Sequence, residues 1–162
     1  MVIQKIGEID IKKIQQEIQQ FNLTDRQIPL QGRTRDDISG AAGKMAELGA
    51  PEQYYTELLY DSCLYINSVI TQFDMIRTRI MNLPQYSCYS YHQDGSVRVH
   101  IPVITEAGCF LAIDKTLYEL PADGSVFLVD TTRFHTAING SYTPGFIRTH
   151  IVGAYHGLER TL

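Results

Sequence analysis

The sequence predicts an α+β protein in which most of the regular structure is β. Two observations support this prediction. Apolar residues recur every three or four positions in parts of the first 72 residues, whereas from Phe73 onward they alternate with polar residues between closely spaced turn signals. Short, punctuated strands of this kind are typical of an antiparallel sandwich or barrel, and we expect the preceding helices to pack on its outside.

The composition is that of an ordinary globular protein, with 162 residues, 44% of them hydrophobic and 20% charged. The net charge of -4 and the scattered basic residues argue against a nucleic-acid partner. No apolar run reaches the roughly 18 residues of a membrane helix, and the amino terminus does not predict a signal peptide. Three widely spaced cysteines favour free thiols in a reducing compartment, so we expect a cytoplasmic protein.

The first 72 residues are expected to be mainly helical. After a short strand at 2–6, Asp10 is the predicted N-cap of a helix whose apolar face is Ile11, Ile14, Ile18 and Phe21. Residues 22–49 contain Pro29, four glycines and a charged run, and they are read equally as a functional loop or as a solvated connection. Residues 51–72 are expected to form one long helix, which would break, if anywhere, near Asp61-Ser62.

The second part of the chain is expected to form strands separated by turns rich in Gly, Pro, Asn and Asp. The predicted strands are 75–82, 87–93, 97–104, 109–113, 125–129, 135–138 and 146–154. We therefore expect a single domain over residues 1–162, in which residues 1–72 give mainly helical support and residues 73–156 form the β core.

A metal site is predicted from the run 89–103, which reads YSYHQDGSVRVHIPV. His92 and Asp94 are two residues apart, so on a strand both side chains would face one cavity. His135 follows His92 by 43 residues (135 minus 92), which in a double-stranded β-helix leaves room for about four strands before the chain returns. Two histidines and one carboxylate form the facial triad of non-haem iron(II) oxygenases, which leaves coordination positions open.

Arginine residues near this run suggest an anionic ligand. Arg148 would suit a cosubstrate dicarboxylate, because a guanidinium binds a carboxylate in a bidentate fork. Arg98 and His100, and likewise Arg148 and His150, are two residues apart and would share a strand face. Other interpretations stay open: Asp94 with Gly95 is also a good hairpin turn, and both arginines would suit surface ion pairs.

Motifs between Arg77 and His150 resemble the aspartyl/asparaginyl β-hydroxylase family of iron(II)- and 2-oxoglutarate-dependent dioxygenases, which includes bacterial proline hydroxylases. The matching pieces, in order, are RTRIMNL, YHQDG, RVHIPVIT, LPADGSVFLVDTTRFHTAINGS and RTHIV. The resemblance implies a double-stranded β-helix core of the jelly-roll or cupin type. It also implies iron ligation by His92, Asp94 and His135, anchoring of the distal carboxylate of 2-oxoglutarate by Arg148, and further cosubstrate contacts from Arg98 and His100.

The function implied by the resemblance is hydroxylation of an amino-acid side chain, in a free amino acid such as proline or in a peptide or protein, with iron(II), 2-oxoglutarate and dioxygen. Two alternatives are a cupin-like metal-binding protein without oxygenase activity and a zinc-dependent hydrolase or isomerase that uses the same ligands. His150 is either a partner of the site or a plain strand residue, and His156 is expected to be unrelated to it. The sequence leaves the substrate and the oligomeric state open.

Overall fold

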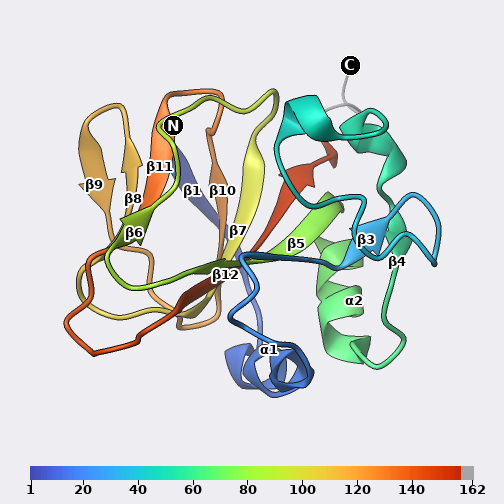
Figure 1. Cartoon of the computed structure of the whole chain (residues 1–162), viewed down its shortest axis with the longest axis horizontal. Coiled ribbons are helices and arrows are strands. Elements are labelled where there is room, and N and C mark those ends of the chain that lie inside the picture. Colours follow the sequence, from blue (N-terminus) through green and yellow to red (C-terminus); the bar gives the residue numbers. More distant parts are fainter. Residues whose placement is uncertain (158–162) are drawn as a thin grey trace.

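The strands of the computed structural model form two larger antiparallel sheets and one short pair (Figure 1). Within residues 1–157, the part of the chain that the structure describes, the larger sheet has the order β1-β10-β7-β12-β5-β2 and the smaller sheet the order β6-β11-β8-β9. The larger sheet comprises β1 (Ile3–Glu8), β10 (Ser125–Val129), β7 (Arg98–Ile104), β12 (Arg148–Tyr155), β5 (Met75–Leu83) and β2 (Gln27–Pro29). The remaining strands are β6 (Ser87–Cys88), β11 (His135–Asn139), β8 (Cys109–Ile113), β9 (Thr116–Tyr118) and the pair β3 (Gln31–Gly32) and β4 (Glu57–Leu58).

The order of the strands identifies the fold. From β5 onward the chain passes back and forth between the two sheets, with β5, β7, β10 and β12 in the larger sheet and β6, β8, β9 and β11 in the smaller one. This alternation is the double-stranded β-helix, the jelly-roll arrangement of antiparallel strands. The predicted fold class, mostly β with helices outside a double-stranded β-helix, is confirmed.

The alternating sequence of β7 explains how one sheet serves both a core and a site. Val99, Ile101 and Val103 are completely buried in the apolar core that the sheet shares with the helices. Arg98 and His100, at the positions between them, line the cavity on the other face. Since successive side chains of a strand point to opposite faces, an R-x-H pattern inside an apolar strand places its polar groups together in the cavity.

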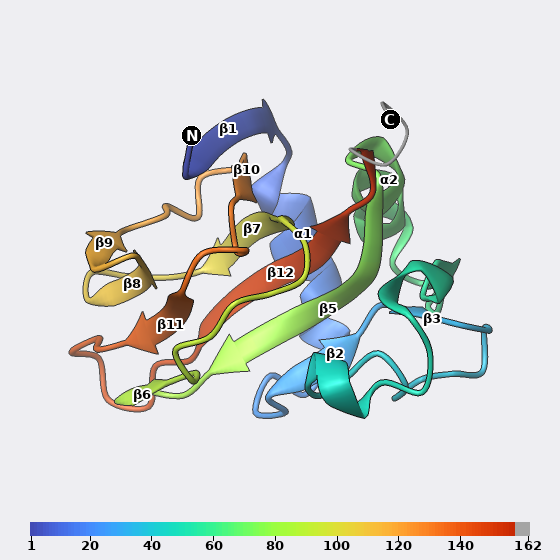
Figure 2. The same ribbon diagram turned by 90° about the horizontal axis from the view of Figure 1, so that it is seen from above.

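The helices cover the face of the larger sheet that is turned away from the cavity (Figure 2). Helix α1 (Ile11–Glu17) continues into the 3-10 helix η1 (Ile18–Gln20), and α2 (Leu64–Gln72) precedes β5. Asp10 caps α1 as predicted, because its carboxylate accepts from two backbone N–H groups of the first turn. No helix in the described part of the chain is long and apolar enough to span a membrane.

The predicted helix over residues 51–72 is wrong in its first half. The chain there forms the 3-10 helix η3 (Glu52–Tyr54) and then β4, and only α2 is α-helical. The backbone N–H of Leu59 donates to the carbonyl of Leu30 at 3.1 Å, and the carbonyl of Tyr55 accepts from the N–H of Arg77 at 2.8 Å. These long-range hydrogen bonds override the local helical periodicity. A third 3-10 helix, η2 (Met45–Glu47), adds little, so the first 72 residues are less helical than expected.

The predicted strand 87–93 is also shorter than expected, because β6 ends at Cys88. His92 lies beyond it and forms an isolated bridge with His135. The first motif of the predicted metal site therefore lies on a loop, and the direction of its side chains is set by this bridge instead of by a continuous strand.

Candidate metal centre

The backbone brings the three predicted ligands together from two parts of the chain. The N–H of His92 donates to the carbonyl of His135 at 3.1 Å, and the N–H of His135 donates back to the carbonyl of His92 at 2.8 Å. The N–H of Asp94 donates to the carbonyl of Thr131 at 2.8 Å, which holds the loop against the turn that precedes β11. One candidate ligand atom from each of the three residues lies within 4.8 Å of the others.

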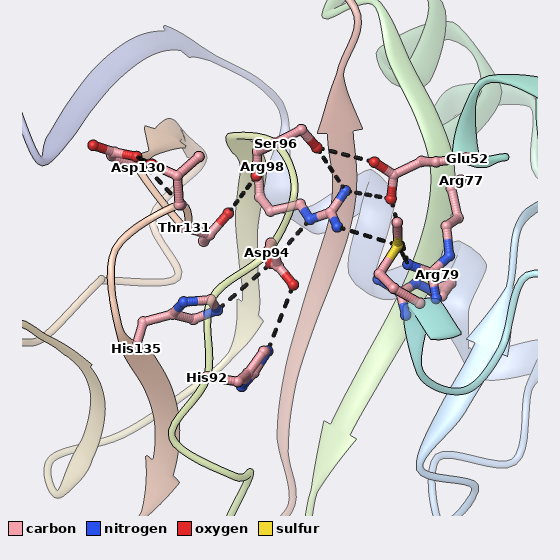
Figure 3. A network of polar contacts seen from close by, with 12 residues as sticks. Glu52, Arg77, Arg79, His92, Asp94, Ser96, Arg98, Asp130, Thr131 and His135 are labelled. Atoms are coloured by element: carbon pink, nitrogen blue, oxygen red, sulfur yellow. Dashed lines mark hydrogen bonds and ion pairs between the residues drawn. The ribbon is translucent and has the colours of Figure 1, made fainter. Parts of the chain in front are cut away.

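The side chains point toward one another as a metal site requires (Figure 3). The Nε2 atom of His92 lies 3.5 Å from Oδ1 of Asp94, and the Nε2 atom of His135 lies 3.6 Å from Oδ2. The Nδ1 atoms contact backbone carbonyls, at 2.6 Å on Ser90 and 2.9 Å on Arg133. Each Nδ1 therefore carries the proton and each Nε2 offers its lone pair, as in other histidine metal sites. Two imidazoles and a carboxylate in this arrangement fit a divalent metal ion, and iron(II) oxygenases use this donor set.

The protonation states of Asp94 and His135 also suit a metal. Burial opposes ionisation of Asp94, but the charge and hydrogen bond of Arg98 outweigh it and hold the pKa of this carboxyl below its ordinary value. Burial lowers the pKa of His135, so its ring is neutral at neutral pH. A carboxylate and a neutral imidazole are the forms that bind a metal.

A buried network of ion pairs connects Asp94 through Arg98 to Glu52 and Arg77 (Figure 3). The Nε atom of Arg98 donates to Oδ2 of Asp94 at 3.1 Å, and its Nη1 donates to Oε2 of Glu52 at 2.6 Å. Glu52 also pairs with Arg77 at 3.4 Å and accepts from the hydroxyl of Ser96 at 2.9 Å. Since the side chain of Arg98 is only 2% exposed, the interpretation as a surface ion pair is wrong, and Arg98 orients the carboxylate of Asp94.

The triad opens into a cavity of about 690 Å³ between the two sheets. Arg98, His100 and Arg148 line this cavity together with the triad, so the structure brings all six predicted site residues to one place. The segment 43–46 also lines the cavity, which answers the question of what the region 22–49 does: part of it is a wall of the site.

Arg148 is buried at 3% exposure and has no carboxylate within ion-pair distance among the described residues, so it is not part of a surface ion pair. Its Nη2 lies 3.1 Å from Nδ1 of His150, and the ring of His150 packs edge-on against that of His100. His150 is therefore a partner of the site. Burial lowers the pKa of Arg148 to about 10, which leaves a charged guanidinium at neutral pH.

Several residues of the site escaped the sequence interpretation. Arg77 and Arg79 line the cavity from β5, and the signal that could have revealed them is two arginines two residues apart in an otherwise apolar strand. Glu52 carries no such signal, because it meets Arg98 across 46 residues of chain. His156 is not among the described residues that line the cavity, and its ring lies 3.8 Å from the carboxylate of Asp74.

Comparison with known proteins agrees with this geometry. A family model described as aspartyl/asparaginyl β-hydroxylase matches residues 8–147, which include the triad and end one residue before Arg148. No curated protein matches the sequence. Among solved structures, the chain is similar to one titled "Non-heme monooxygenase, ThoJ-Ni complex", with 12% identity, a TM-score of 0.47, and coverage of 95% of this chain and 74% of that one. Because the family match spans most of the chain and the whole donor set, the protein belongs to the aspartyl/asparaginyl β-hydroxylase family, a family of hydroxylases.

Proposed function

We propose that the protein is an iron(II)- and 2-oxoglutarate-dependent dioxygenase that hydroxylates an amino-acid side chain. The observation that carries this proposal is the combination of a complete donor triad with a buried guanidinium, Arg148, that faces the same cavity without a carboxylate partner among residues 1–157. A protein that only stored a metal would have no need for that unpaired charge, because burying it is costly.

Iron(II), when bound by His92, Asp94 and His135, would supply the centre at which dioxygen and 2-oxoglutarate react, so that a substrate C–H group becomes C–OH while 2-oxoglutarate becomes succinate and carbon dioxide. The protein contributes position and protonation. The carbonyls of Ser90 and Arg133 fix the two rings, and Arg98 keeps Asp94 ionised and oriented.

The cosubstrate is assigned to the part of the cavity lined by Arg148 and His100. Arg148 would hold the distal carboxylate in a bidentate fork, with its guanidinium fixed by the contact between Nη2 and His150. The buried Nδ1 of His100 has no hydrogen-bond partner among the described residues, and burial lowers the pKa of this residue to about 3. A neutral His100 would therefore be available to hydrogen-bond the cosubstrate. Contact between Arg98 and the cosubstrate stays a prediction.

The test is spectroscopic and then catalytic. Anaerobic addition of iron(II) and 2-oxoglutarate should give the weak visible charge-transfer band of the chelate, and admission of air with candidate substrates should give succinate. His135→Ala should remove both signals because a ligand is lost, whereas His156→Ala should keep them. Absence of the band and of succinate in the unaltered protein would exclude the oxygenase and leave the zinc enzyme or the metal-binding cupin.

A further inference from the structure

We propose that Arg79 forms a second anion-binding site in the cavity, and that it receives the free carboxylate of the substrate. The inference rests on the proposed function and narrows it: the substrate is a free amino acid and not a residue inside a peptide chain. Arg79 lies on β5 and lines the same cavity as the metal triad.

Arg79 is a buried cation whose hydrogen bonds are incomplete. It is 6% exposed, its Nη1 donates to the side-chain carbonyl of Gln27 at 3.0 Å, and its Nε has no partner in the part of the chain that the structure describes. The same oxygen of Gln27 accepts from the N–H of Gly43 at 2.9 Å, so the neutral partner is itself fixed. No carboxylate of the described residues lies within ion-pair distance of Arg79. A buried guanidinium with a free donor is a site prepared for an anion.

The charges around the cavity support this assignment. Arg77 and Arg98 share the carboxylates of Glu52 and Asp94. Arg79 and Arg148 are left without an ion pair to any carboxylate of the described residues, and burial lowers their pKa values to about 9 and about 10, with Arg77 and Arg98 lowering that of Arg79 further. A dicarboxylate cosubstrate that spans the metal and Arg148 would neutralise only one of these two guanidinium groups. A second carboxylate is needed for the other.

The two arginines occupy different parts of the cavity floor. Arg79 pairs with Val152 of β12, and Arg148 lies four residues earlier on that strand, about 13 Å of extended chain at roughly 3.3 Å per residue. The charged groups that act on Arg79 are Arg77, Arg98, Asp94 and Glu52, whereas no charged group of the described residues has such an effect on Arg148. Tyr89 lies near both arginines. Arg79 thus shares its cavity with the metal triad and has Asp94 among its charged neighbours, so a substrate held by Arg79 can reach the metal. Figure 3 shows Arg79 beside Arg77 and Glu52, on the opposite side of the view from His92 and His135.

A carboxylate held at Arg79 would fix a small substrate beside the metal and would exclude a residue within a chain, whose α-carboxyl is an amide. The cavity volume of about 690 Å³ lies in the range of small-molecule sites. An acidic side chain within a peptide carries the same chemistry, so the test must separate the two sources.

The experiment is a calorimetric titration of the anaerobic protein, loaded with iron(II) and 2-oxoglutarate. The ligands are the free amino acids that occur in proteins, their carboxamides, and aspartate and glutamate that are acetylated on the amino group and carboxamidated at the α-carboxyl group. We expect at least one free amino acid to bind, and its carboxamide to bind at least about tenfold more weakly. Arg79→Gln should weaken the binding of the free amino acid by a similar factor, while the charge-transfer band titrates with 2-oxoglutarate as it does in the unaltered protein. Arg148→Gln should instead weaken the binding of 2-oxoglutarate.

Variants control for folding and for charge. Arg79→Lys keeps the charge without the fork and should retain part of the binding if Arg79→Gln is too unstable to measure. Arg35→Gln removes an exposed arginine that pairs with Asp61, and it should change the binding of neither the free amino acid nor 2-oxoglutarate.

Four results would overturn the inference. The first three are that no free amino acid binds, that the carboxamides bind as well as the free amino acids, or that only the blocked aspartate and glutamate bind. The fourth is that Arg79→Gln weakens the binding of 2-oxoglutarate as much as Arg148→Gln does. If the band never forms, the proposed function fails. Titration of the metal-free protein with the same free amino acids then decides the inference separately.

Discussion

Asp94 is the residue on which the chemistry of the site converges. Its two carboxylate oxygens face the Nε2 atoms of His92 and His135, and one of them also accepts from Arg98. A hairpin residue with no further role would need none of these contacts. The positive charge of Arg98 favours the ionised form of the Asp94 carboxylate inside a buried site, as the charge of a metal ion would.

Two buried histidines make the metal-free protein sensitive to acid. Burial, together with the charge of Arg148, lowers the pKa of His100 to about 3 and that of His150 well below 6.5. Below pH 6.5 the unfolded chain binds protons that the folded chain does not, so the free energy of unfolding falls as the pH falls, by about 1.4 kcal/mol per pH unit for each histidine. Urea denaturation between about pH 7 and about pH 5 should show this loss. A flat profile over that range would contradict the burial of both rings in their neutral form.

At the scale of elements, β5 is bent so that it can serve the network. Between the pairs formed by Val152 with Arg79 and by Ala154 with Ile76, the register shifts by one residue, which marks a β-bulge. Arg77 lies in this bulge with a φ of 49°. Its N–H leaves the sheet and bonds Tyr55, while its side chain reaches the segment 40–54 by donating to the carbonyls of Ala41 and Gly43.

Glu52 fastens this segment to the sheet, and its loss should be felt in both stability and metal binding. Glu52→Gln leaves Arg77 and Arg98 buried with one fewer counter-charge, so we expect a loss of about 3 kcal/mol in the free energy of unfolding. We also expect metal affinity to fall by about tenfold or more, because Arg98 loses the partner that orients it. Urea denaturation and metal titration measure the two effects, and Glu57→Gln, at an exposed position of β4, is the control. A variant as stable as the original would contradict the role of Glu52.

For the whole molecule, the metal should act as a clamp between distant parts of the chain. It would join the loop after β6 to the start of β11, and so add to the hydrogen bonds that already link them, among them the two between the backbones of His92 and His135. With free metal at 100 times its dissociation constant, we expect the free energy of unfolding to rise by about 2.7 kcal/mol. Thermal denaturation with and without metal tests this. His92→Ala should abolish the gain and His156→Ala should keep it, whereas an equal gain in both variants would place the metal elsewhere.

The strand pattern of the sequence predicted an antiparallel sandwich or barrel, and the family resemblance of its motifs implied the double-stranded β-helix and the candidate ligands. In an alternating strand the apolar positions show which face is buried, so the sequence alone assigns Val99 and Ile101 to the core and Arg98 and His100 to the opposite face. It failed for residues 51–63, where a helical spacing of apolar residues is overridden by hydrogen bonds to Leu30 and Arg77. Local periodicity reports a local preference, and long-range pairing outweighs it.

Only the tertiary structure decided what surrounds the ligands. It placed Glu52 against Arg98, left the Nε of Arg79 unpartnered among residues 1–157, and folded the segment 43–46 into a wall of the cavity. These relations join residues far apart in the chain. The energies of these interactions depend on burial and on which charges share a cavity, and local sequence patterns predict neither.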